Sequence, residues 1–311
     1  MTLRHFLADD DLTAAEQADV LALAAALKRE PFSRRPFEGP RTVAILSDKP
    51  TLRTQTSFHA GVAELGGNSM LVDGRMAGVG ERESIPDSAR ILSGHSAAIV
   101  WRTSAQERLV EMAEHASVPV VNALTDDYHP CQILADLQTV AEYKGTLAGV
   151  RFAYVGDGAN NMANSYLLGG ALAGLHVRIG APQGYQPAAE IITRAEVLAA
   201  TTGGSILITD SATEAVNGAD VVATDTWVSM GMETENEARL AALGAYQVDS
   251  RLMSHADAEA IVLHCLPAYR GKEITGEVLD GPQSVVWDEA ENRRHAQKAI
   301  LTFLDGIARQ R

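Results

Sequence analysis

The stretch of sequence that decides the fold reads Arg151-Phe-Ala-Tyr-Val-Gly-Asp-Gly-Ala-Asn-Asn161. Its first five residues form a mostly apolar segment of strand length, and its two glycines permit a tight turn. A segment of helix length follows the asparagines. A strand, a glycine turn and a helix in this order are typical of proteins in which helices cover a parallel sheet.

Similar apolar segments recur on both sides of this stretch, separated by segments of helix length. Apolar strands that alternate with helices indicate parallel sheets that are buried on both faces. We predict strands at residues 42–47, 70–72, 98–101, 118–121, 151–155, 176–179, 205–209, 221–224, 260–264 and 284–287. The predicted fold class is therefore α/β, with two doubly wound parallel-sheet domains linked by helices.

Two helices at the ends of the chain frame these domains. Thr13 and Glu16 form a capping-box pattern, which predicts a first helix that extends to about Lys28. An amphipathic segment at residues 291–308 predicts the last helix. We place the domains at residues 1–133 and 134–290, and the C-terminal helix at residues 291–311.

Composition excludes several classes of protein. The 311 residues are 46% hydrophobic and 21% charged, which excludes wholesale disorder. No apolar run reaches the roughly 18 residues of a membrane helix, and we expect no signal peptide in residues 1–11. The net charge of −14 argues against a nucleic-acid partner, which needs a basic face. Two distant cysteines exclude a disulfide framework and predict a cytoplasmic protein.

Polar residues follow the predicted strands, where ligands bind in parallel sheets. Residues 47–58 offer hydroxyls and Arg53 before a helix, a combination suited to phosphate. The competing interpretation is an ordinary solvated helix cap. The glycine and lysine spacing of a P-loop is absent.

A second cluster combines Arg102 with His129 and Gln132. The arginine is placed to meet the same phosphate, and His129 and Gln132 are placed to polarise a carbonyl or hold an amide. An ordinary turn histidine is the competing interpretation of His129. A Cys131 nucleophile is disfavoured because it stands only two residues from His129, and no cysteine and histidine pair has metal-finger spacing.

The glycine turn at residues 156–161 resembles a dinucleotide fingerprint only in part. Asn161 stands where the third glycine belongs, and no acidic residue ends the next strand. Asparagines at this place suit the carboxylate or amine of an amino acid instead.

The fourth cluster follows the strands near residues 224 and 264. Asp225 can bind an ammonium group, while Ser229 and the Met230 backbone can bind a carboxylate or amine. Cys265 is a candidate partner for an amino nucleophile. A small buried side chain is the ordinary interpretation of a lone cysteine.

Taken together, the clusters resemble the aspartate/ornithine carbamoyltransferase family, and within it the ornithine branch. The motifs are His-Pro-Cys-Gln at 129–132, Asp-Gly-x-Asn-Asn at 157–161, Asp-x-Trp-x-Ser-Met-Gly at 225–231, His-Cys-Leu-Pro at 264–267 and Glu-Ala-Glu-Asn-Arg at 289–293. The resemblance runs nearly end to end.

The resemblance implies a carbamoyl-phosphate domain, an amino-acid domain and a last helix that packs back on the first domain. It implies carbamoyl transfer from carbamoyl phosphate to the side-chain amine of ornithine, giving citrulline and phosphate, as in arginine biosynthesis. It further implies a homotrimer with sites between subunits, and neither a cofactor nor a metal.

The resemblance also implies roles for individual residues. It places carbamoyl phosphate at Thr51, Leu52, Arg53, Thr54, Arg102, His129, Gln132, Cys265, Leu266 and Arg293. It places ornithine at Asn161, Asp225, Ser229 and Met230. The expected catalytic residues are Arg102, His129, Cys265 and Arg293.

Three departures from the family pattern fall on the carbamoyl-phosphate side. Leu52 replaces a hydroxyl, Gln55 replaces an arginine, and Gly78 stands where a Gln or His reaches across the subunit interface. Arg75 lies near enough in the sequence to replace that side chain. The alternatives are therefore a paralogue that carbamoylates another diamino acid or amine, or a homologue impaired in carbamoyl-phosphate use.

Overall fold

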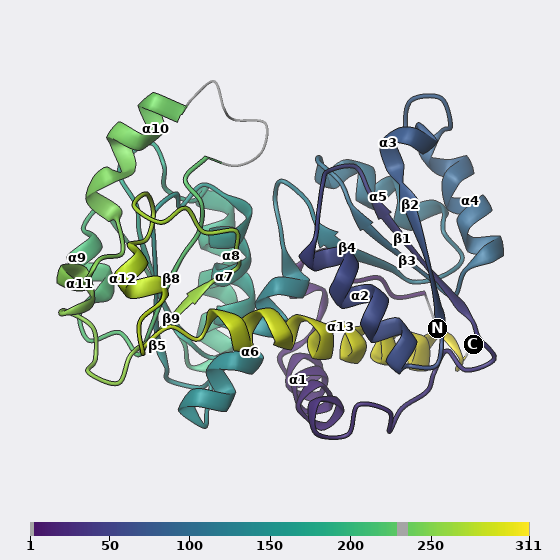
Figure 1. Cartoon of the computed structure of the whole chain (residues 1–311), viewed down its shortest axis with the longest axis horizontal. Coiled ribbons are helices and arrows are strands. Elements are labelled where there is room, and N and C mark those ends of the chain that lie inside the picture. The colour runs from purple at the N-terminus through teal and green to yellow at the C-terminus, as the bar shows by residue number, and fades with distance from the viewer. Residues whose placement is uncertain (1–2, 229–235, 311) are drawn as a thin grey trace. The chain divides into compact units, whose positions relative to one another are not determined.

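A computed structural model of the chain describes residues 3–228 and 236–310. The chain divides into two compact units. Unit 1 comprises Met1–Gln138 and Glu291–Arg311, and unit 2 comprises Thr139–Ala290. Each unit holds one parallel sheet flanked by helices, which confirms the predicted α/β class (Figure 1).

The sheet of unit 1 has four parallel strands in the order β2-β1-β3-β4. They are β1 (Thr42–Ser47), β2 (Asn68–Asp73), β3 (Ala98–Arg102) and β4 (Val120–Leu124). The chain leaves β1 for β2 on one side and returns to β3 on the other side. The carboxyl ends of β1 and β3 are therefore a topological switch point, where ligands of open α/β sheets bind.

The helices of unit 1 cover both faces of this sheet. They are α1 (Ala14–Arg29), α2 (Arg53–Glu64), α3 (Gly74–Ala77), α4 (Ile85–His95), α5 (Gln106–His115), the first part of α6 (Pro130–Lys144) and the later part of α13 (Val286–Ala308), with the 3-10 turn η1 (Asp9–Asp11). The Thr13 hydroxyl and Glu16 form the predicted capping box at the start of α1. Leu46, Ile99, Trp101 and Met112 belong to the buried core.

The sheet of unit 2 has five parallel strands in the order β7-β6-β5-β8-β9, with its switch point between β5 and β8. The strands are β5 (Arg151–Val155), β6 (His176–Gly180), β7 (Ser205–Thr209), β8 (Val221–Thr224) and β9 (Ile261–His264). The helices are α7 (Asn161–Leu172), α8 (Ala189–Thr202), α9 (Ala212–Val216), α10 (Asn236–Leu243), α11 (Ser250–Met253) and α12 (Gly276–Leu279), with the 3-10 turn η3 (Gly244–Tyr246).

The predicted strand at residues 284–287 is wrong. Ser284 forms only an isolated bridge with Val262, and α13 begins at Val286. Asp288 and Glu289 lie in the first turn of that helix, where carboxylates interact favourably with the helix dipole. The last helix is therefore five residues longer at its start than the predicted 291–308.

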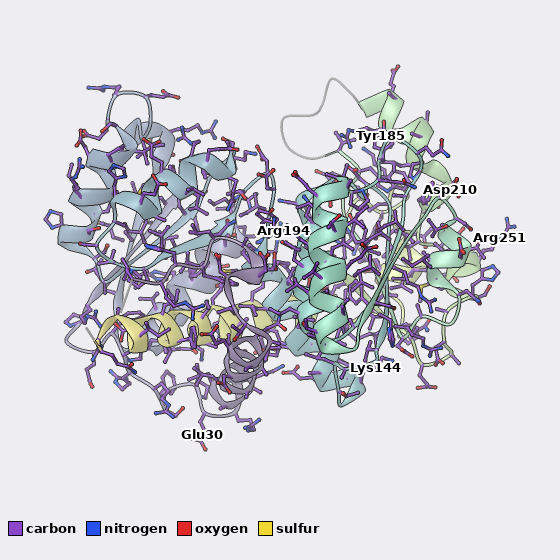
Figure 2. All side chains as sticks on the ribbon, turned by 180° about the vertical axis from the view of Figure 1, so that it is seen from behind. Glu30, Lys144, Tyr185, Arg194, Asp210 and Arg251 are labelled. Carbon is purple, nitrogen blue, oxygen red and sulfur yellow. The ribbon has the colours of Figure 1, made fainter. Side chains whose placement is uncertain are left out.

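Charged side chains such as Glu30 and Arg251 are exposed and point away from the sheets (Figure 2). Among the described helices, none combines the length and the apolar content that a membrane-spanning segment requires.

Candidate active site

The loop after β1 leads directly into α2 at the switch point of unit 1. Thr51 is half-buried, and the side chain of Leu52 is 72% exposed at the N-cap position. A leucine side chain cannot accept a hydrogen bond, so it leaves the first amides of α2 uncapped. Arg53 begins the helix, and Arg102 ends β3 opposite Ser47 of β1. The phosphate-binding candidates thus lie on neighbouring strand ends.

Arg293 gathers three of the predicted residues around one buried guanidinium. Its NH2 group donates to Thr54 Oγ1 at 3.2 Å, and its NH1 group donates to Gln132 Oε1. NH1 also lies 3.4 Å from His129 Nε2. Arg293 is only 2% exposed. A planar guanidinium with several donors suits such a cluster, because it holds groups from different elements in one geometry.

The electrostatics of this cluster keep His129 neutral. Burial lowers the pKa of His129 well below its ordinary value, and the charges of Arg293, Arg102 and Arg53 lower it further. A neutral imidazole that meets cations with its Nε2 lone pair retains a proton on Nδ1. Burial also raises the pKa of Cys131 to about 12, so its thiol does not act as a thiolate.

A cavity of about 290 Å³ opens at the carboxyl ends of the same strands in unit 1. Its lining residues are Asp48, Lys49, Gly74, Arg75, Val79, Glu81, Ser104 and Arg108. Arg75, noted from the sequence, is therefore part of the wall. Arg108 stabilises the wall of this cavity, because it donates to Thr103 Oγ1 at 3.0 Å and to the Val79 carbonyl at 2.8 Å.

Gly78 is required by the local backbone. It ends α3 with φ = +70°, a conformation that L side chains rarely adopt. A Cβ at this position would lie 3.1 Å from Cβ of Arg82. A glutamine at position 78 would therefore strain the loop conformation that this chain adopts.

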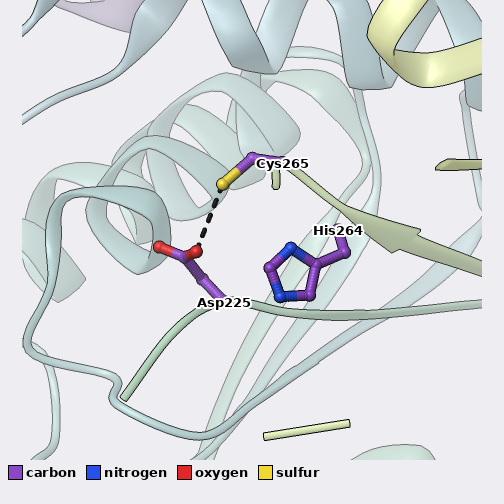
Figure 3. A group of neighbouring side chains, drawn as sticks. All are labelled: Asp225, His264 and Cys265. Atoms are coloured by element: carbon purple, nitrogen blue, oxygen red, sulfur yellow. Dashed lines mark hydrogen bonds between the residues drawn. The ribbon is translucent and has the colours of Figure 1, made fainter. Parts of the chain in front are cut away.

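In unit 2, β8 and β9 bring Asp225 and Cys265 together. Thr224 pairs with His264 in the sheet, so the residues that follow them are neighbours. Cys265 Sγ donates to Asp225 Oδ1 at 3.2 Å (Figure 3). Asp225 is 7% exposed, and burial raises its pKa. The contact between this carboxylate and this thiol was not predicted from the sequence, which assigned each residue a separate role toward the substrate.

The glycine turn after β5 supplies a second polar group of unit 2. Asn160 caps α7, accepting from Ala163 N at 2.9 Å and donating to Tyr154 Oη at 2.9 Å. Asn161 is the first residue of α7. Burial raises the pKa of Tyr154 well above its ordinary value, and the nearby Asp225 raises it further. Tyr154 therefore stays protonated.

A buried ion pair supports the same turn. Arg239 of α10 donates to Asp157 Oδ2 at 2.6 Å, and its guanidinium lies over the ring of Tyr185 at 5.3 Å. Ser229 and Met230, predicted to bind ornithine, lie outside the described residues.

Within the part of the chain that the structure describes, one group of side chains could hold a metal ion: Asp225, His264 and Cys265. Both nitrogens of the imidazole are already engaged. Nδ1 accepts from Leu266 N at 2.9 Å, and Nε2 lies 3.1 Å from Glu273 Oε1. This donor set fits a metal poorly, because the histidine would first have to break a buried hydrogen bond.

Sequence reasoning missed several residues around both switch points. Asp48 and Tyr154 lie within the quoted stretches 47–58 and 151–161 but were given no role there. Arg108, Arg239 and Glu273 stand 6 to 8 residues from the nearest motif. Each of them is marked in the sequence only by its charged or polar side chain. Their partners become visible only when the sheets are assembled.

Both halves of the chain match one protein family. Residues 4–142 match the aspartate/ornithine carbamoyltransferase carbamoyl-P binding domain, and residues 148–304 match the Asp/Orn binding domain of the same family. Ornithine carbamoyltransferases of Mycolicibacterium paratuberculosis and Clavibacter sepedonicus are 58% and 60% identical. The first alignment covers 98% of both chains, and the second covers 97% of this chain and 98% of the relative.

Solved structures agree with the sequence relatives. Ornithine carbamoyltransferase from Pyrococcus furiosus is 40% identical, with a TM-score of 0.93 and coverage of 98% of both chains. The anabolic enzyme of Campylobacter jejuni is 35% identical, with a TM-score of 0.93 and coverage of 99% of this chain and 100% of that one. This chain belongs to the aspartate/ornithine carbamoyltransferase family.

Proposed function

We propose that the protein transfers the carbamoyl group of carbamoyl phosphate to the side-chain amine of L-ornithine, giving L-citrulline and phosphate. The amine nitrogen forms a bond to the carbamoyl carbon, the carbon–oxygen bond to phosphate breaks, and the nitrogen loses a proton. The observation that carries this proposal is the buried cluster of Arg293 with Thr54, His129 and Gln132, beside the charges of Arg53 and Arg102.

The donor half of the reaction belongs to unit 1. Thr51, Leu52 and Arg53 present a helix N-terminus to the phosphate, and Arg102 adds a bidentate cation. A dianionic leaving group gains most from fixed charges placed where its charge develops. Gln132 and neutral His129 supply polar contacts of the kind that a carbamoyl group needs.

The acceptor half belongs to unit 2. The buried Asp225 and the half-buried Cys265 form the acidic pair that receives the side-chain amine, and Asn161, the first residue of α7, is the proposed contact for the α-amino acid end. A buried carboxylate with a raised pKa is a stronger base than an exposed one, so Asp225 suits the removal of a proton from the amine. Leu266, Ser229 and Met230 stay predicted substrate contacts.

A colorimetric assay for ureido products tests the proposal directly. Purified protein receives saturating carbamoyl phosphate and, in separate wells, ornithine, lysine, 2,4-diaminobutyrate, 2,3-diaminopropionate or putrescine. Fast turnover with ornithine alone is expected. Turnover with another amine and silence with ornithine would replace the proposed acceptor, and silence in every well would reject carbamoyl phosphate as the donor.

We further propose a homotrimer. Leu52, Leu71 and Met76 of unit 1 are 72%, 51% and 86% exposed, and β2 is an edge strand of its sheet. Such exposed apolar side chains favour burial against another copy of the chain. Light scattering coupled to gel filtration should give three times the 33.1 kDa of one chain. A monomeric mass would reject the trimer.

We further propose that the reaction takes place in the cytoplasm and serves arginine biosynthesis. Cys131 and Cys265 are free thiols, in keeping with a reducing compartment. Growth of an arginine auxotroph that lacks its own carbamoyltransferase, restored by this gene on medium without arginine, would support the biosynthetic direction.

A further inference from the structure

The carboxylate of Asp48 bonds to the side chains on both sides of Arg102. Asp48 directly follows β1. Its Oδ1 accepts from Trp101 Nε1 at 3.1 Å, and its Oδ2 accepts from Thr103 Oγ1 at 2.6 Å. The Asp48 amide also donates to the Arg102 carbonyl at 2.9 Å. Because Trp101 and Thr103 are fully buried, these bonds are shielded from competing water. Asp48 therefore fixes the piece of backbone from which the Arg102 side chain projects.

Arg108 of α5 connects this carboxylate to the loop that follows α3. Its NH2 group lies 3.4 Å from Asp48 Oδ2 and donates to the Val79 carbonyl at 2.8 Å. Its Nε donates to Thr103 Oγ1 at 3.0 Å. The side chains of Asp48 and Arg108 are only 14% and 28% exposed, so salt screens their attraction less than that of a surface pair. A guanidinium bonds to several groups in fixed directions, which a lysine ammonium on a flexible stem does not reproduce.

Two glycines leave room for these charged groups, one at the start of α3 and one just after it. A Cβ at Gly74 would lie 1.9 Å from Asp48 Oδ1, and a Cβ at Gly80 would lie 2.6 Å from Arg108 NH1. Carbon atoms do not approach polar atoms so closely. The hydrogen bonds of Asp48 and Arg108 also prevent either group from moving aside without a loss of stability. The backbone of residues 74–80 is therefore packed directly against the pair.

The same pair balances charge beside the proposed phosphate site. Asp48 precedes Thr51 and Arg53 in the loop that leads from β1 to the N-terminus of α2. A carboxylate without a partner in this loop would repel a phosphate dianion. The positive charge of Arg108 offsets that repulsion. The charge that the donor meets is then set by Arg53 and Arg102.

We propose that Asp48 and Arg108 are positioning residues of the donor site. Asp48 holds Arg102 relative to the loop that carries Arg53. Arg108 compensates the charge of Asp48 and ties it to the Val79 carbonyl, so that the phosphate loop, the end of β3 and the loop after α3 keep one geometry. This inference rests on the proposed function, because it takes carbamoyl phosphate as the ligand of Arg53 and Arg102.

Graded variants at both positions separate positioning from a general loss of structure. Asp48→Asn keeps the shape of the side chain and one oxygen acceptor, whereas Asp48→Ala removes every side-chain bond. Arg108→Lys keeps the charge, whereas Arg108→Met removes it and keeps most of the apolar stem. Asp48→Asn combined with Arg108→Met removes both charges. Arg90→Met is the matched control, because Arg90 is an exposed arginine of unit 1 that pairs with Asp87 on the same helix.

Calorimetric titration with carbamoyl phosphate measures donor binding without an acceptor. Arg108→Met should bind the donor about tenfold or more weakly than Arg90→Met, because Asp48 then faces the phosphate without its charged partner. The double variant should bind more tightly than Arg108→Met alone, since the uncompensated charge is gone. A purely structural role predicts the opposite order, because the double variant has lost more native bonds. A double variant that binds more weakly than Arg108→Met would therefore overturn the proposal.

The remaining variants keep the test decisive if Arg108→Met does not fold. Asp48→Ala should weaken donor binding about tenfold, and Arg108→Lys and Asp48→Asn about threefold each. Binding within about 1.5-fold of Arg90→Met in all of the variants that fold would also overturn the proposal.

Initial rates supply a second readout. The KM for ornithine at saturating carbamoyl phosphate should stay within about threefold of wild type, because Asp225 and Cys265 belong to unit 2. A parallel rise in the KM for both substrates would indicate a general loss of structure and would count against positioning. Wild-type protein that does not bind carbamoyl phosphate would reject the proposed function, and this inference with it. Binding by wild type that the variants retain in full would reject this inference alone.

Discussion

Replacing Arg293 by lysine tests the centre of the proposed donor site. The native guanidinium is 2% exposed and donates to Thr54 and Gln132 while NH1 faces His129. Lysine keeps the positive charge but replaces a planar fork by a single ammonium on a flexible stem. It can satisfy one of these partners at full strength, and the remaining partners lose their common donor.

The magnitude follows from the number of bonds lost. A hydrogen bond to a charged group contributes about 1.5–3 kcal/mol, and Arg293→Lys loses one or two such bonds. We take about 3 kcal/mol as the central value, which corresponds to roughly a hundredfold loss in kcat/KM for carbamoyl phosphate at about 1.4 kcal/mol per decade. The charge itself is kept, so a larger loss is not expected.

The assay measures initial rates of citrulline formation over a range of carbamoyl phosphate at saturating ornithine. Arg294→Lys is the matched control, because Arg294 is the next residue and forms half-exposed ion pairs with Glu64 and Glu291. Such pairs contribute little, so the control should stay within about twofold of wild type. A value for Arg293→Lys within about threefold of its control would refute the assigned role of the guanidinium.

Four further predictions concern the other groups. Asp225→Asn should lower kcat/KM for ornithine by about a hundredfold, because the buried base beside Cys265 is lost. The thermal midpoint should change little, and an unchanged kcat/KM would contradict the role of Asp225 as a base. Gln55→Arg should lower the KM for carbamoyl phosphate by about three- to tenfold, because the gain from a charged contact with the donor exceeds the cost of a cation near the N-terminus of the helix. Gly78→Gln should mainly lower the thermal midpoint, because position 78 has a positive φ. Because the pKa of His129 is lowered in the folded state, the unfolded chain binds its proton first, so the free energy of unfolding should fall as the pH drops below about 6.5. Urea titrations between pH 7 and 5 should show this fall, and His129→Gln should reduce it.

The sequence was sufficient for the fold because strand patterns in parallel sheets are strong. Nine of the predicted apolar segments coincide with or overlap the observed strands. The tenth, at residues 284–287, was wrong because a short apolar run can also begin a helix, and the acidic residues that follow it favour the helix. Strand order was not predictable, since it depends on contacts between distant segments.

The candidate site was predicted where residues follow strands in recognisable motifs. Those motifs led to Arg293, His129, Gln132, Asp225 and Cys265. The supporting groups were not predictable, because their partners come from other elements: Glu273 meets His264 only through a folded loop. The structure also changes the interpretation of Gly78. Its positive φ shows that the backbone favours glycine at this position, which the sequence alone does not reveal.

The two units place opposite charges at their switch points, and this division suits carbamoyl transfer. The chain carries a net charge of −14, yet Arg53, Arg102 and Arg293 act together on His129 in unit 1. Unit 2 instead buries Asp225 and Glu273. A phosphate leaving group requires cations that remain charged, and arginine does so because its pKa lies above the working pH. An ammonium must lose a proton before its nitrogen can attack, and a buried carboxylate with a raised pKa takes that proton more readily than an exposed one. Exchanging the two environments would leave the phosphate facing carboxylates and the ammonium without a carboxylate to take its proton. The acidic composition of the whole chain therefore says less about the reaction than the separation of charge between its two sheets.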